Sequence, residues 1–129
     1  MSADPIPEDV RKFILFKIDS IAQMEALLLL RENAQEKWDT ATVARRLYIS
    51  EQETADVLAH LWTQGFLAVN SGTPPLYQYS PHSPELGQMV DKMAEVYAKH
   101  LVPVTNLIHS KPRTRIQEFA DAFKLRKDE

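Results

Sequence analysis

Apolar residues recur at helical spacing from the start of the chain, and polar caps separate the segments. The first stripe covers residues 10–18 and follows Pro7 and two acids, which suit the first turn of a helix. Ser20 and Gln23 then form a capping box, in which each side chain bonds to a free backbone N–H. A second stripe continues to about residue 36. The pattern therefore predicts two amphipathic helices in the first third of the chain.

A helix–turn–helix pattern comes next. Asp39 or Thr40 caps a short helix over residues 41–48, and Ser50 opens another helix after a tight turn. Gly65 ends this helix, because glycine readily adopts the left-handed conformation found at helix ends. The longer of the two helices is expected to bury Thr54/Ala55, Leu58, Leu61 and Trp62, and Trp38 is expected to close the edge of the core.

A β-hairpin is predicted after the second of these helices. Two short apolar or alternating runs, residues 66–69 and 76–79, enclose a cluster of Asn, Ser, Gly and Pro. Helix, helix, turn, helix and hairpin is the order of a winged helix. The predicted fold class is therefore mostly α, a winged helix-turn-helix with a small β-hairpin wing and additional C-terminal helices.

The C-terminal part is predicted to be helical. Ser83, followed by proline and glutamate, starts a stripe of about 23 residues that Pro103 should kink near Lys99, and Pro112 opens a last helix. The stripe either packs on the N-terminal helices or pairs with a second chain, and we favour pairing. We thus divide the chain into a winged-helix domain, 1–81, and a C-terminal dimerisation or partner extension, 82–129. The expected dimer interface comprises Leu86, Val90, Met93, Tyr97, Leu101, Val104 and Ile108.

Composition excludes several classes of protein. The 129 residues suit one compact domain with a helical appendage, and 44% hydrophobic content suffices for a core. The absence of cysteine excludes disulfides, thiolate metal sites and a cysteine nucleophile. The first eight residues lack a signal-peptide pattern, and the longest apolar run, Ala26 to Leu30, is far too short to span a bilayer. A cytoplasmic protein without membrane contact is expected.

The helix–turn–helix region resembles a known group of proteins. Residues 42–50, with Leu58, Leu61 and the Gly-Phe-Leu at 65–67, resemble bacterial winged-helix transcription regulators, MarR- and PadR-like in pattern. The resemblance covers about residues 20–80 and implies DNA-binding regulation of transcription. The tail, 106–127, looks like tails on bacterial winged-helix proteins of unknown activity, which implies a shared architecture.

The distribution of charge argues against strong DNA binding. The net charge is −3, and no Lys or Arg occurs between Arg46 and Lys92, so the expected recognition helix and the hairpin carry no cation. The outward face of that helix is expected to show Gln52, Glu53, Asp56, Val57, His60 and Gln64. Positive charge would come from Arg45 and Arg46 on the preceding helix, and from N-terminal cations if these lie nearby.

No candidate for catalysis emerges. The four histidines lack the spacing of metal ligands, since His100 and His109 share the long helix but are nine residues apart and face different ways. Three glycines cannot form a phosphate loop, and each of Ser20, Ser50, Ser83 and Ser110 is expected to begin a helix. No enzyme activity, metal or cofactor is expected. The sequence predicts a homodimeric transcription regulator that contacts DNA, or alternatively a winged-helix adaptor that binds a protein. The expected contacting residues in either case are Arg45, Arg46, Gln52, Glu53, Asp56, His60 and Gln64.

Overall fold

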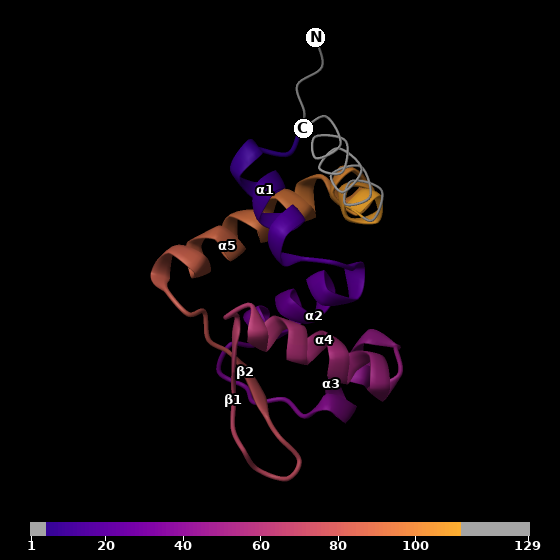
Figure 1. Cartoon of the computed structure of the whole chain (residues 1–129), viewed down its shortest axis with the longest axis vertical. Helices are drawn as coiled ribbons and strands as arrows, with labels where there is room; N and C mark the ends of the chain where they lie inside the picture. Colours follow the sequence, from indigo (N-terminus) through magenta and orange to yellow (C-terminus); the bar gives the residue numbers. More distant parts are fainter. Residues whose placement is uncertain (1–4, 112–129) are drawn as a thin grey trace, which may run out of the picture.

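The computed structural model describes residues 5–111 of the chain, and the helix predicted from Pro112 onward lies outside this range. A further helical segment, residues 101–111, follows the last labelled helix. The labelled elements are α1 (Glu8–Lys17), α2 (Ile21–Glu32), α3 (Thr40–Leu47), α4 (Glu51–Thr63), β1 (Leu67–Val69), β2 (Tyr77–Tyr79) and α5 (Pro84–Lys99). Figure 1 shows the hairpin at one end of the molecule, with α1 and the C-terminal helices at the other.

The predicted helix caps are confirmed. Each accepts a hydrogen bond from a backbone N–H in the first turn of its helix. The cap-to-N–H pairs are Ser20 with Gln23 (3.1 Å), Asp39 with Thr42 (2.8 Å), Ser50 with Glu53 (3.0 Å) and Ser83 with Leu86 (3.2 Å). Ser110 differs from the prediction, because it lies within the helical segment 101–111 and its hydroxyl donates to the Leu107 carbonyl at 2.8 Å.

The predicted hairpin is also confirmed. β1 and β2 pair antiparallel, with Leu67 opposite Tyr79. Trp38 extends this small sheet from the α2–α3 connection, since its backbone N–H and carbonyl each bond to Tyr77 at 2.8 Å. The indole is only 4% exposed, as expected for a residue that closes the core. Gly65 ends the preceding helix with φ of 88°, which a glycine adopts without strain.

A single hydrophobic cluster runs through the described residues. It joins the inner faces of α1, α2 and α4 to α5 and to the segment 101–111. The C-terminal stripe therefore packs as core, which is the alternative that was not favoured from the sequence. Five of its seven expected interface residues are buried within one chain: Val90, Met93, Tyr97, Val104 and Ile108. Leu101, by contrast, is 54% exposed.

The expected long helix is broken rather than kinked. α5 ends at Lys99, His100 leaves the helical conformation with φ of −133° and ψ of 54°, and a new helix begins at residue 101. Pro103 thus occupies the first turn of the new helix, where a missing N–H leaves no helical carbonyl unpaired. The break lies one residue from the position predicted for the kink.

Candidate functional site

The turn between α3 and α4 sets the position of the expected recognition helix. Tyr48 ends α3 in the left-handed conformation, with φ of 59°, and the backbone N–H of Ile49 bonds to the Ala44 carbonyl at 3.2 Å. Ser50 then caps α4. These local bonds reverse the chain within three residues, so that α3 and α4 pack together.

The buried face of α4 differs from the prediction at two positions. Thr54, Val57, Leu58 and Leu61 are buried, which is an i, i+3, i+4, i+7 stripe. Val57 was expected to face outward but is 5% exposed, and Trp62 was expected to face inward but is 52% exposed. Trp62 was predicted to be buried because it follows Leu58 by four residues, but the buried stripe ends at Leu61. Thr54 is tolerated in the core because its hydroxyl donates to the Ser50 carbonyl at 2.8 Å.

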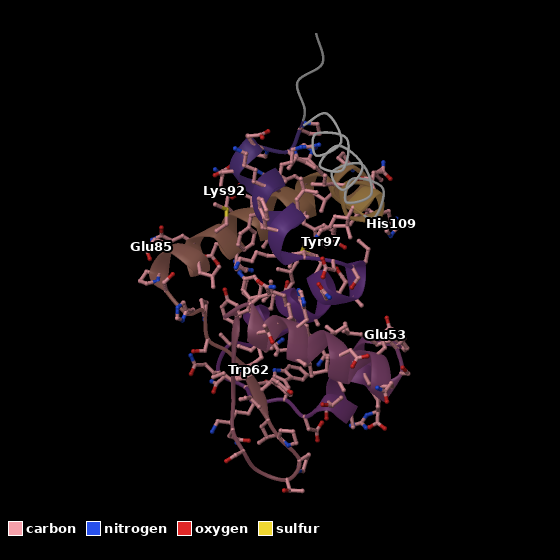
Figure 2. All side chains as sticks on the ribbon, in the orientation of Figure 1. Glu53, Trp62, Glu85, Lys92, Tyr97 and His109 are labelled. Atoms are coloured by element: carbon pink, nitrogen blue, oxygen red, sulfur yellow. The ribbon has the colours of Figure 1, made fainter. Side chains whose placement is uncertain are left out.

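The outward face of α4 is polar and acidic. Gln52, Glu53 and Asp56 are exposed as expected, and Gln64 is partly exposed at the C-cap. Figure 2 shows Glu53 and Trp62 toward opposite ends of the helix. Because α4 and the hairpin contain no Lys or Arg, this face offers no cation to a phosphate.

His60 does not belong to that open face. Its Nε2 lies 2.9 Å from the carbonyl oxygen of Lys17, and its Nδ1 lies 3.9 Å from a carboxylate oxygen of Asp19. The ring is therefore directed at the connection between α1 and α2. This tertiary contact explains why the prediction of a solvent-facing His60 is wrong, and it gives the residue a structural role.

Arg45 and Arg46 are exposed in the last turn of α3, where Arg45 lines a depression with Glu51 at the start of α4 and Arg46 lies toward α2 and α5. The guanidinium of Arg45 donates to the Thr42 hydroxyl at 3.3 Å, and that of Arg46 lies 5.5 Å from the centre of the Trp38 ring. Both contacts orient the side chain without neutralising its charge. α1 lies at the opposite end of the molecule from the hairpin (Figure 1), and its last residue, Lys17, contacts α4 through the backbone carbonyl that faces His60.

A buried lysine was missed by the sequence analysis. Lys111 is 3% exposed, and its ammonium donates to the Ile18 carbonyl at 2.7 Å and to the Asp19 carboxylate at 2.5 Å. The signal was present, since position 111 continues the stripe of Val104 and Ile108 at helical spacing. Asp19 thus lies between a lysine from the C-terminal helix and a histidine from α4.

The described residues contain no group of three or more His, Asp or Glu side chains arranged to hold a metal ion. No helix within residues 5–111 is both long enough and apolar enough to cross a bilayer. The exposed surfaces of α3, α4 and the hairpin form the candidate functional site.

Comparisons with known proteins were made for sequence and for structure. No family model matches the chain, and no curated protein matches it in sequence. Among solved structures, HlyU from Vibrio cholerae has a TM-score of 0.52 and 16% identity, covering 72% of this chain and 99% of its own. A mutant of ZitR from Lactococcus lactis has a TM-score of 0.50 and 19% identity, covering 83% and 74%. The adhesin competence repressor AdcR from Streptococcus pyogenes has a TM-score of 0.50 and 16% identity, covering 88% and 83%.

This chain has a winged-helix fold. The likeness rests on the whole arrangement rather than on the motif alone, because it extends over most of each chain. In the winged helix described here, α4 takes the place of the recognition helix and the β1–β2 hairpin takes the place of the wing. The narrower resemblance to MarR- and PadR-like regulators stays a prediction.

Proposed function

We propose that this winged helix is a non-catalytic bacterial transcription regulator that acts in the cytoplasm as a homodimer and binds duplex DNA. The observation that carries the proposal is the placement of α4, whose polar face is open to solvent and whose first residue, Glu51, shares a depression with Arg45 of α3. In DNA-binding winged helices this helix enters the major groove. The solved structures of similar fold support this placement.

The proposed mechanism is positional. The amide of Gln52 is of the type that pairs with adenine in the major groove, and the two arginines are of the type that contacts phosphates. Glu53 and Asp56 repel the DNA backbone, so sequence-independent affinity should be low. Two copies at a fixed separation would add their contacts, and specificity would come from the spacing of two half-sites.

Fluorescence anisotropy of a labelled random duplex at increasing salt concentration tests this proposal. With two arginines from each of two copies, about four phosphate contacts predict a log–log slope of about −3 to −4. The variant Arg45→Ala/Arg46→Ala should abolish both the binding and its salt dependence. Arg11→Ala on α1 is the control, because it removes a positive charge from a helix at the opposite end of the molecule from the hairpin, and it should bind like the unmodified chain.

A protein-binding adaptor is the second candidate function. It is favoured by the lack of cations on α4 and the hairpin, and by two exposed aromatic side chains near the ends of α4, Tyr48 (94% exposed) and Trp62 (52% exposed). Aromatic residues are enriched in protein interfaces, and the acidic face would suit a basic partner. Absence of DNA binding at about 50 mM salt would favour this adaptor over the regulator.

A further inference from the structure

A groove on the molecule lies between α2, α5 and the end of α3. Its volume is about 840 Å³, and its apolar lining includes the partly exposed Leu28, Leu29 and Leu47. Ala94 and Ala98 line the α5 side, one turn apart. Because these side chains are small, a helix from outside could approach α5 closely.

The rim of this groove is acidic. Its lining carries four carboxylates against two arginines, of which Arg31 pairs with Asp91 at 2.9 Å and Arg46 keeps its charge above the Trp38 ring, so the carboxylates outnumber the cations by two. Two further rim carboxylates, Glu32 and Glu95, are exposed. A partner that suits this groove therefore carries both apolar and cationic side chains.

Two carboxylates of the rim form a hydrogen bond or an ion pair within the chain. Glu25 accepts a hydrogen bond from Tyr97, and burial together with this bond raises the pKa of Tyr97 to about 12. Tyr97 thus stays a donor at neutral pH. Glu95 pairs with Lys99 at 2.9 Å, but both side chains are 66% exposed and such a pair exchanges readily for another. Glu32 and Glu95 remain accessible to a partner's cations.

The exposed face of α1 has the complementary chemistry. Phe16 is 78% exposed, the greatest exposure of any Phe in residues 5–111, and it lies with Phe13 and Met89 at a shallow apolar depression of about 550 Å³. Lys12 and Lys17 line the same depression, and neither forms an ion pair within the described residues. The one carboxylate there, Asp9, is already paired with Lys92.

We propose that α1 of one copy docks in the acidic groove of a second copy of this chain. Phe16 would cover the leucines of the groove, and Lys12 and Lys17 would meet Glu32 and Glu95. The groove and the exposed face of α1 are different surfaces, and a dimer related by a twofold axis would contain this contact twice. This inference rests on the homodimer in the proposed function, and it replaces an interface stripe that the structure buries within one chain.

The first test is the mass of the full chain in solution, measured by light scattering after size-exclusion chromatography. The unmodified chain is expected to be a dimer, and Phe16→Glu or Leu28→Glu should each give a monomer with an unchanged circular dichroism spectrum. Val102→Glu is the matched control, because Val102 is also apolar and 64% exposed but lines neither surface. It should remain a dimer.

Reversal of charge tests the pairing itself. Lys12→Glu/Lys17→Glu should raise the dimer dissociation constant about tenfold or more, and Glu32→Lys/Glu95→Lys should do the same. The four changes combined should restore most of the affinity, because the charges are complementary again. A simple loss of folding would not be rescued in this way.

The outcomes separate this inference from the function on which it rests. A dimer that Phe16→Glu and Leu28→Glu leave intact overturns the interface, while the homodimer stands. A monomeric unmodified chain overturns the interface and the homodimer together, and the DNA titration then decides whether single copies bind DNA. Failure of the combined charge variant to recover affinity overturns the pairing of α1 with the groove.

Discussion

Asp19 shows how much structure depends on one side chain. Its carboxylate accepts from Lys111, whose side chain is 4% exposed, and it lies 3.9 Å from the imidazole of His60. Lys111 also bonds to the Ile18 carbonyl at the end of α1. A buried ammonium needs such partners, since water cannot reach it. Asp19 therefore connects the N-terminal helix, the C-terminal helix and α4.

Asp19→Asn should destabilise the fold by about 2–4 kcal/mol, because it leaves the Lys111 charge buried without a counter-charge. Lys111→Met in the same chain should recover part of the loss by removing that charge. Unfolding in urea, followed by circular dichroism, measures both effects. Asp91→Asn is the matched control: its pair with Arg31 is more exposed, so its loss should cost about 0–1 kcal/mol. Equal costs for the two asparagine variants would show that Lys111 does not depend on Asp19.

At the scale of elements, the link between α3 and α4 rests on an unusual backbone conformation. Tyr48 has φ of 59° and ψ of 40°, a region that non-glycine residues adopt at a cost. Its side chain is 94% exposed, so packing does not offset that cost. The strain is thus retained in the turn that orients α4.

Tyr48→Gly should stabilise the chain by about 0.5–1 kcal/mol, because glycine adopts this conformation without a steric penalty. The gain is smaller than the full strain, since glycine also increases the entropy of the unfolded chain. Tyr48→Ala separates the two effects: it removes the ring but keeps the strain and should give no gain. Thermal unfolding measures all three chains, and equal stability of the glycine and alanine variants would contradict the explanation.

The helices also show which features of the fold could be predicted from the sequence. The side chains of Ser20, Asp39 and Ser50 accept hydrogen bonds from backbone N–H groups three residues away. Caps and helix starts therefore follow from short sequence patterns, and they were predicted correctly. The direction of His60 and the exposure of Trp62 depend on which elements lie beside α4, and no local pattern encodes that. The partner of the C-terminal stripe was likewise undetermined, because an apolar face suits a core and a dimer equally well.

At the scale of the whole molecule, the described residues share one core. The cluster contains Ile14 and Leu27 from the N-terminal helices, Leu61 from α4 and Met93 from α5, all fully buried. Salt bridges also cross from α1 and α2 to α5, between Asp9 and Lys92 and between Arg31 and Asp91. The boundary proposed after residue 81 therefore cuts through contiguous packing.

Met93→Ala tests whether the two parts unfold together. The substitution should cost about 2–5 kcal/mol, because it leaves a cavity at a fully buried position. Trp38 and Trp62 are the only tryptophans and both precede residue 81, so fluorescence reports on the winged-helix part, while far-UV circular dichroism reports on all helices. If the core is shared, Met93→Ala lowers the urea midpoint by the same amount with both probes. An unchanged fluorescence midpoint with a shifted circular dichroism midpoint would instead show that residues 1–81 fold on their own. The C-terminal helices would then be a separate extension, as the sequence predicted.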